Sequence, residues 1–182
     1  ISHPIETTME MNPEKVTEEG LLTIEKWVNR ASIGVQSFDT KELTFLGREH
    51  TQDHIHRALT LLNQSKINNI NIDLIFASPI GTLETLKNTL ETTLTYTPTH
   101  ISTYSLSIED KTAFKAKNTP KLDEGNDLKH YQYICQWLPK QGYPQYEISA
   151  FSQPGKECQH NLSYWELTPY IGVGPSACSY YQ

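Results

Sequence analysis

Three polar side chains lie near the ends of three short alternating runs of sequence: Glu10, Gln36 and Asp73. Carboxylate and amide groups that converge at the ends of neighbouring strands form a binding site for a polar ligand. The alternative is a structural network in which the three groups satisfy one another. Arg48 follows Gln36 after a loop and, taken alone, is predicted to be a surface arginine.

A second stretch that could do chemistry is CQHNLSYW, residues 158–165, with a thiol, an imidazole, two amides, a phenol and an indole. On composition alone it fits an aromatic surface turn or a core strand with one satisfied histidine. In the second case His160 is a buried structural imidazole. We predict structural or solvated roles for the other histidines: His3, His50, His54, His56, His100 and His130.

The composition indicates one globular domain of ordinary size. The chain has 182 residues, 37% hydrophobic and 20% charged, with a net charge of −6 spread along its length. No basic surface for nucleic acid is expected, and no run approaches the ~18 apolar residues of a membrane span. The start, ISHPIETTMEMNP, lacks the features of a signal peptide. We expect a cytoplasmic protein, with peripheral membrane contact left open. Both ends look cut, so we expect a piece of a longer protein.

Three cysteines stand far apart in the sequence: Cys135, Cys158 and Cys178. Their spacing fits no close-set metal motif. A reducing cytosol disfavours disulfides. We therefore predict three unbridged thiols.

Four runs alternate apolar and polar residues with the period of a β-strand. They are IETTMEM (5–11), ASIGVQS (31–37), INIDLIF (70–76) and HISTYSLS (100–107). Apolar side chains share one face of each run, and Glu10, Gln36 and Asp73 lie on the opposite face.

Apolar residues at helical spacing of three and four fill the gaps between these runs. We predict helices after Pro13 and over 53–64, 83–95 and about 124–140. Thr82 is the expected N-cap of the third helix and Gly142 the expected C-cap of the fourth. The predicted inward side chains are, in chain order, Val16, Leu22, Ile24 and Trp27; Ile55, Ala58, Leu59 and Leu62; Leu83, Leu86, Leu90 and Leu94; and Tyr131, Cys135 and Leu138.

This strand–helix alternation, with a repeat of roughly 30 residues, predicts an α/β fold of right-handed βαβ units with a parallel sheet. An open doubly wound sheet and a segment of a barrel both fit. An open parallel sheet prefers apolar residues on both faces. In a barrel, the polar face found here would point into the lumen. The sequence contains neither a dinucleotide fingerprint nor a P-loop.

Five stretches carry a family resemblance: RASIGVQSFDTKELTFLGREH, INIDLI, PTHISTYSLSIEDKTAF, QYEISAFSQPGKECQHNLSYW and YIGVGPSACSY. Over nearly its whole length the chain resembles the radical SAM family of oxygen-independent coproporphyrinogen III oxidases and, more closely, the HemW-type heme chaperones. The resemblance implies part of a radical SAM (β/α)₆ partial TIM-type barrel over residues 1–120. A C-terminal helix and strand region is expected over 121–182.

In that family, S-adenosylmethionine (SAM) lies across the carboxyl ends of the strands. Carried over position by position, the resemblance implies that SAM contacts Glu10, Gln36, Arg48 and Asp73. The two carboxylates accept hydrogen bonds from hydroxyl or amino groups, and Arg48 pairs with the carboxylate of SAM. Gln36 can donate or accept.

Other parts of the family pattern are missing or changed. The C-x₃-C-x₂-C loop that binds a [4Fe–4S] cluster, and the glycine-rich strand after it, are expected before Ile1 in the full-length protein. We therefore expect this chain alone not to hold the cluster or cleave SAM. Ala77 in FASPIGT replaces a glycine of the family, and Cys178 in GPSACSY stands where the family usually has histidine.

The segment HNLSYW resembles the H-N-x-x-Y-W segment of HemW-type proteins, which is associated there with heme binding and which the true oxidase normally lacks. An imidazole is a common axial ligand of heme iron. Cys158 and Cys178 are alternative soft ligands. The resemblance implies four heme-site residues: His160 as axial ligand, Asn161 to orient it or meet a propionate, and Tyr164 and Trp165 as flat apolar surface.

The resemblance therefore implies a heme-binding and heme-transfer protein. Its expected partners are heme and heme-receiving apoproteins such as respiratory cytochromes. One alternative is an oxidase that decarboxylates coproporphyrinogen III to protoporphyrinogen IX by SAM radical chemistry. The other is an inactive fragment. Both active subgroups share the barrel, so only the HNLSYW segment separates them.

Overall fold

A computed structural model describes residues 5–107, 124–174 and 177–181. In this part of the chain five strands form one sheet, ordered as in the sequence. The first four strands pair in parallel, and the fifth is antiparallel to the fourth. The strands are β1 (Thr8–Met11), β2 (Arg30–Gln36), β3 (Asn69–Phe76), β4 (His100–Ser105) and β5 (Ala150–Ser152). The predicted α/β class with a parallel-dominated sheet is confirmed.

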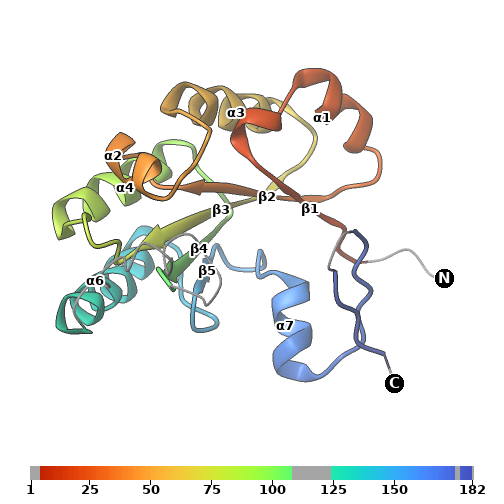
Figure 1. Cartoon of the computed structure of the whole chain (residues 1–182). Coiled ribbons are helices and arrows are strands. Elements are labelled where there is room, and N and C mark those ends of the chain that lie inside the picture. Colours follow the sequence, from red (N-terminus) through yellow and green to blue (C-terminus); the bar gives the residue numbers. More distant parts are fainter. Residues whose placement is uncertain (1–4, 108–123, 175–176, 182) are drawn as a thin grey trace.

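The helices that connect the parallel strands cover the apolar side of this sheet. Figure 1 shows α1 and α3 on one side of the sheet and α7 on the other. In the described ranges the helices are η1 (Pro13–Lys15), α1 (Glu18–Ile24), α2 (Thr40–Phe45), α3 (Gln52–Gln64), α4 (Leu83–Thr95), α6 (Glu124–Trp137), η2 (Leu138–Gln141) and α7 (Gln159–Glu166). No helix in the described ranges is long and apolar enough to cross a membrane.

Two of the predicted helices are confirmed in extent, and the buried face is confirmed in full only for the first of them, α3. In α3, Ile55, Ala58, Leu59 and Leu62 are all buried. In α4, the N-cap residue Thr82 accepts a hydrogen bond from the backbone amide of Thr85 at 3.1 Å. The buried leucines of α4 are Leu86 and Leu90, whereas Leu83 is 36% exposed and Leu94 is partly buried.

The predicted inward face of the first helix is wrong at two positions. Leu22 and Trp27 are 57% and 78% exposed, and Leu21 is the buried leucine. The segment divides into η1 and α1, because Thr17 begins a new helix by accepting a hydrogen bond from the amide of Gly20. A fresh helix start rotates the inward face relative to one continuous helix.

The fourth predicted helix continues beyond its regular part. It comprises α6 and the 3₁₀ turn η2, and Gly142 ends it with a φ of 89°, as expected for a C-cap. Leu138 is fully buried, while Tyr131 and Cys135 are partly buried against the core.

The sheet extends into the predicted C-terminal region. Its strand β5, within 121–182, pairs with β4, so the described parts of both predicted regions share one sheet. The predicted boundary at residue 120 and His3 lie outside the described residues. The antiparallel β5 was not expected from the alternation, because a strand of three residues carries too little pattern.

The two faces of the sheet differ in chemistry. On one face, Ile33, Ile72, Ile101 and Phe151 are register partners across four strands, and all are fully buried. On the opposite face, the register row is Glu10, Ser32, Asn71, His100 and Ser152. The apolar row forms the centre of the core, and the polar row carries the candidate site.

Candidate functional site

Asp73 is the centre of the polar face. Its register partners on either side are Gly34 and Ser102. The hydroxyl of Ser32 donates to Asp73 Oδ2 at 2.9 Å, and Asn71 Nδ2 donates to Asp73 Oδ1 at 2.8 Å. Burial raises the pKa of the Asp73 carboxyl, while these hydrogen bonds and the charge of Arg30 partly oppose the rise.

Gly34 leaves a cradle beside this carboxylate. A Cβ at Gly34 would lie 2.8 Å from Gln36 Nε2 and 3.5 Å from Asn12 Oδ1, so two amide side chains border the space. The ladder between β2 and β3 shifts register between Gly34 and Gln36, and Gln36 has a φ of 71°. Such an irregularity re-aims a side chain at a strand end. A polar ligand at this cradle would meet a carboxylate and amides.

Glu10 and Arg48 lie at different parts of this end of the sheet. Glu10 is exposed on the edge strand β1, in the polar row beside Ser32. Arg48 lines a groove of about 320 Å³ between α2 and α3. The same loop is anchored to the carboxyl end of β2, because His50 Nε2 lies 3.1 Å from the carbonyl oxygen of Val35. Glu10, Gln36 and Asp73 thus lie on the polar side of the sheet, with Glu10 on its exposed edge strand, and Arg48 lines the groove between α2 and α3.

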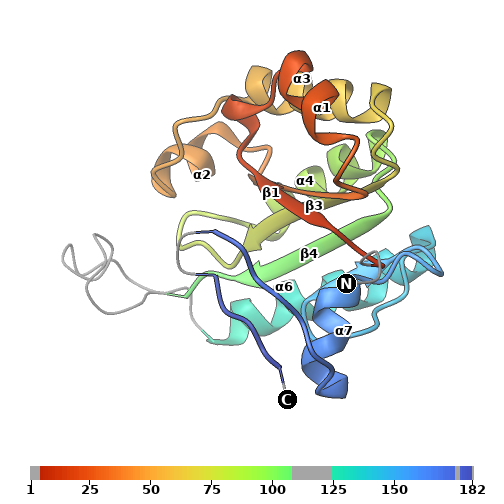
Figure 2. The ribbon, with the colours of Figure 1, turned by 90° about the vertical axis from the view of Figure 1, so that its right-hand side faces the viewer.

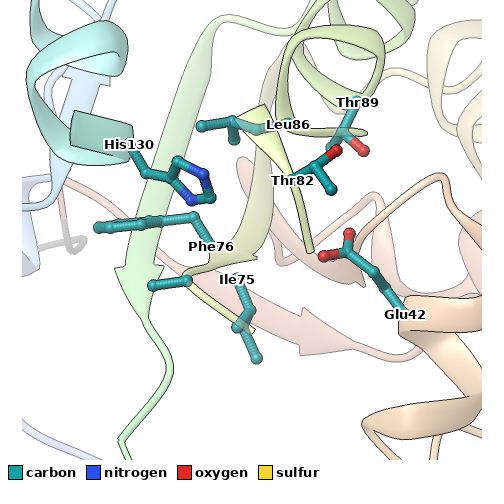
Figure 3. Close-up of a pocket in the computed structure, with 8 residues that line it drawn as sticks. Glu42, Ile75, Phe76, Thr82, Leu86, Thr89 and His130 are labelled. Carbon is teal, nitrogen blue, oxygen red and sulfur yellow. The ribbon is translucent and has the colours of Figure 1, made fainter. Parts of the chain in front are cut away.

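A buried carboxylate connects the loops that follow β2 and β3. Glu42 is 6% exposed, and it accepts hydrogen bonds from the hydroxyls of Ser37 at 2.6 Å and Ser78 at 2.7 Å. Figure 3 shows Glu42 and His130 on facing walls of a small cavity of about 10 Å³, close to the space one water needs. Ala77, in the same loop, has a φ of 61°, in the region that favours glycine. The alanine that replaces the family's glycine at position 77 therefore has a strained backbone conformation.

The CQHNLSYW segment forms helix α7 with Cys158 as its N-cap. Both composition-based interpretations, a surface turn and a core strand, are therefore wrong. His160 is exposed, so the interpretation as a buried structural imidazole is also wrong. A helix forms because the segment carries neither glycine nor proline, and Leu167 ends it with a φ of 54°.

The imidazole of His160 lies among aromatic rings at the surface. Its ring centroid is 4.9 Å from that of Tyr164 and 4.6 Å from that of Tyr170, both in edge-on geometry. Tyr164 and Trp165 are 52% and 58% exposed. The α7 site, defined here as His160, Tyr164, Trp165 and Tyr170, offers an accessible imidazole and flat apolar area. Tyr170 lies outside the predicted set, although it is the first residue of the YIGVGPSACSY stretch.

The N-terminus of α7 is held by a residue from the other end of the chain. The carboxylate of Glu6 accepts from the backbone amides of Gln159 at 3.0 Å and His160 at 3.4 Å. Its Oε2 also lies 3.9 Å from Nε of Arg30. A carboxylate at this position complements the helix dipole. In Figure 2 the chain entering β1 and the helix α7 lie close together.

Two further contacts tie α7 to the polar face. The Tyr146 hydroxyl accepts from the Cys158 backbone amide and from Asn161 Nδ2, each at 3.2 Å. Asn161, expected to orient an imidazole or meet a propionate, therefore has its amide directed inward to Tyr146. Burial raises the pKa of the Cys158 thiol to about 11, which disfavours the thiolate that metal binding needs.

The sequence did not single out four of the residues that build this region: Glu6, Asn71, His100 and Tyr146. Alternation placed Glu6 and Asn71 on the polar faces of their strands, which was the available signal. His100 was assigned a structural or solvated role, and it is fully buried. Tyr146 gave no signal, because its partners come from distant segments.

The described His, Cys, Asp and Glu side chains do not gather into a metal site. Within the described ranges no group of three or more His, Cys, Asp or Glu residues is placed to hold a metal ion. In the same ranges the cysteines Cys135, Cys158 and Cys178 form no disulfide. The described residues therefore do not fit a [4Fe–4S] cluster, whereas the polar groups around Gly34 fit the hydroxyl and amino groups of SAM.

Comparisons with known proteins agree with the resemblance. No family model matches the chain. It is 37% identical over 182 residues to the heme chaperone HemW of Lactococcus lactis, covering 96% of this chain and 48% of that protein. It is 38% identical over 173 residues to the heme chaperone HemW of Escherichia coli, covering 94% and 46%. The chain spans about half the length of these curated relatives.

Two solved structures share the fold. Coproporphyrinogen III oxidase (HemN) from Escherichia coli, described as a radical SAM enzyme, aligns with a TM-score of 0.78 at 23% identity, over 96% of this chain and 44% of that one. The archaeal Elp3 of Methanocaldococcus infernus aligns with a TM-score of 0.66 at 20% identity, over 74% and 33%. The chain is thus homologous to the heme chaperones named HemW over about half of their length, and it shares its fold with the radical SAM enzyme HemN.

Proposed function

We propose that the protein to which this chain belongs is a heme chaperone that binds heme at the α7 site and passes it to heme-receiving apoproteins such as respiratory cytochromes. The observation that carries this proposal is the exposed imidazole of His160, flanked by aromatic rings at the surface. The relatives at 34% to 38% identity named heme chaperone HemW support it.

The geometry of the α7 site suits a flat ligand that must later leave. An imidazole nitrogen binds heme iron at an axial position. Tyr164 and Trp165 offer apolar area to the porphyrin without enclosing it. An open site of this kind permits transfer to a partner. The oxidase reading has less support, because the likeness to HemN at 23% identity concerns the fold.

His160→Ala is expected to abolish the Soret shift on heme addition or to weaken heme binding at least tenfold. The reason is the loss of the proposed axial ligand. Heme titration followed by absorbance measures it. His56→Ala, which removes an exposed histidine of α3, is the matched control and is expected to titrate like the parent protein. An unchanged Soret response in His160→Ala would remove His160 as ligand.

We further propose that in the whole protein the cradle at Gly34 holds the ribose or amino groups of SAM. Asp73 would accept hydrogen bonds from them, and Gln36 would border the ligand. Bound together with a [4Fe–4S] cluster, SAM is the source of a 5′-deoxyadenosyl radical. The side chains of this chain contribute binding and orientation.

Asp73→Asn is expected to weaken SAM binding by about ten- to a hundredfold, because a charge-assisted hydrogen bond is worth about 1.5–3 kcal/mol. Equilibrium dialysis with the full-length protein measures the dissociation constant. Glu91→Gln, an exposed carboxylate of α4, controls for the lost charge. Equal affinity in parent protein and Asp73→Asn would place SAM elsewhere.

A further inference from the structure

A continuous chain of hydrogen bonds joins α7 to the carboxylate of Asp73. Asn161 Nδ2 lies 3.2 Å from the Tyr146 hydroxyl, which lies 2.7 Å from His100 Nε2. His100 Nδ1 lies 2.6 Å from Asn71 Oδ1. Asn71 Nδ2 then lies 2.8 Å from Asp73 Oδ1. The chain crosses the polar face of β3 and β4 and connects two sites that are far apart in the sequence.

The Asp73 end fixes the orientation of the first groups. Ser32 donates its hydroxyl proton to Asp73 Oδ2, so Ser32 Oγ accepts from Asn71, and Asn71 therefore presents its NH₂ group to Ser32 and to Asp73 Oδ1. The Oδ1 atom of Asn71 then faces His100 and can only accept. His100 must therefore carry its proton on Nδ1, which leaves Nε2 as an acceptor. The Tyr146 hydroxyl consequently donates to His100 Nε2.

The α7 end independently requires the same direction. The backbone amide of Cys158 can only donate, and it points at the Tyr146 hydroxyl oxygen at 3.2 Å. That oxygen therefore accepts from α7 while its proton goes to His100. Every bond in the chain is donated from α7 toward Asp73. Hydrogen bonds aligned in one direction polarise one another.

Water cannot readily replace the middle of this chain. His100 is 0% exposed and Asn71 is 1% exposed. The hydroxyl of Ser102 fills the remaining lone pair of Asn71 Oδ1 at 3.0 Å, and Asn71 Nδ2 also donates to Ser32 Oγ at 2.7 Å. All four hydrogen-bonding positions of the Asn71 side-chain amide are therefore occupied, and the amide group cannot flip without breaking these hydrogen bonds.

We propose that Tyr146 and His100 are positioning residues that couple the Asp73 site on the sheet to α7, the helix that carries His160. A ligand that donates to Asp73 uses a remaining lone pair of the same two oxygens that Asn71 and Ser32 bond, and so draws on the same carboxylate charge. It thereby changes the polarisation felt at Tyr146 and Asn161. The coupling itself stands on the hydrogen-bond chain, and its consequence for heme rests on the proposed function.

The first test reads the chain directly by NMR. Ring ¹⁵N shifts are expected to show His100 as the neutral Nδ1–H tautomer with Nε2 hydrogen-bonded. In Tyr146→Phe the Nε2 shift moves toward that of an unbonded ring nitrogen, and the Cys158 amide exchanges about tenfold faster. Tyr143→Phe is the matched control, because it removes a buried hydroxyl that donates to the Pro98 carbonyl, off this chain.

The second test is a double-mutant cycle. Asp73→Asn is expected to shift the side-chain amide resonances of Asn161 in the parent protein but not in the Tyr146→Phe background. Equal shifts in both backgrounds, no shift in the parent protein, or an Nε2–H tautomer would each overturn the proposal. If Tyr146→Phe fails to fold, Asn161→Ala breaks the last link at the half-buried end. In the Asn161→Ala background, Asp73→Asn must still shift the NMR resonance of the Cys158 backbone amide.

Heme titration separates this proposal from the proposed function. If the coupling and the proposed heme binding are both correct, Tyr146→Phe weakens heme binding severalfold and Tyr143→Phe does not. The wavelength of the Soret band, which the proposed ligand His160 sets, is then unchanged in both variants. If the parent protein binds no heme, the proposed function fails and the NMR cycle still decides the coupling. If heme binds equally to Tyr146→Phe and the parent protein, the coupling does not extend to heme.

Discussion

Asn71→Leu is expected to lower the free energy of unfolding by about 3–5 kcal/mol. The substitution keeps the number and branching of the side-chain heavy atoms but removes an amide that makes four hydrogen bonds in the interior. His100 Nδ1 and the Ser102 hydroxyl lose their acceptor, and each buried polar group left unpaired costs about 1–3 kcal/mol. Urea denaturation followed by circular dichroism measures the change.

The matched control is Asn88→Leu on α4. Asn88 is exposed, so the same substitution there is expected to change the free energy of unfolding by less than about 0.5 kcal/mol. A loss below about 1 kcal/mol for Asn71→Leu would show that His100 and Ser102 find other partners. It would also remove the argument that the polar face is a single connected network.

The second prediction with a large effect concerns the free energy of unfolding at acidic pH. The free energy of unfolding is expected to fall by about 1.4 kcal/mol per pH unit as pH drops below 6.5, because of His100 alone. Burial, aided by the charge of Arg30, lowers the pKa of His100 from 6.5 to about 3. The folded protein therefore binds fewer protons than the unfolded chain between these values. The stabilisation is complete above pH 6.5 and is lost toward pH 3, on the order of 5 kcal/mol in total.

Other titrating groups contribute to the same curve. Burial also lowers the pKa values of His50 and His130, which adds to the loss in acid. The raised pKa of Asp73 acts in the opposite sense, since its stabilisation is present at low pH and lost as pH rises. The comparison with a variant at position 100 isolates the histidine from these background terms.

The measurement is a series of urea denaturations from pH 7 to pH 4. His100→Gln is expected to flatten the dependence by about one proton, or about 1.4 kcal/mol per pH unit. His56→Gln replaces an exposed histidine and is expected to keep the slope of the parent protein. Identical slopes for His100→Gln and the parent protein would mean that His100 is already protonated or solvated in the fold.

The sequence was sufficient to predict those strands and helices whose periodic pattern of apolar residues is long. The runs that became β2 and β3, and the helices α3 and α4, were recognisable because each repeats its period over seven or more residues. Polar residues at alternating positions also placed Glu10, Gln36 and Asp73 on one face. The similarity to HemW proteins was readable from ordered motifs.

Short or composite elements could not be read in this way. The three residues of β5 and the six of α2 carry too little period to recognise. The first helix was misassigned in its inward face because a new N-cap at Thr17 interrupts it. The CQHNLSYW segment has too weak an amphipathic pattern to show whether it forms a turn, strand or helix.

The sequence by itself determined which residues we propose for the chemistry: the polar strand-end groups and the HNLSYW segment. Only the tertiary structure decided how they are connected. Glu6 and Gln159 are separated by 153 residues, and His100 and Tyr146 by 46, yet both pairs are in hydrogen-bond contact. Local pattern reports the face of an element but not its distant partners. Those are set by packing of the whole sheet, which brings α7 onto the polar face and makes His160 an exposed imidazole.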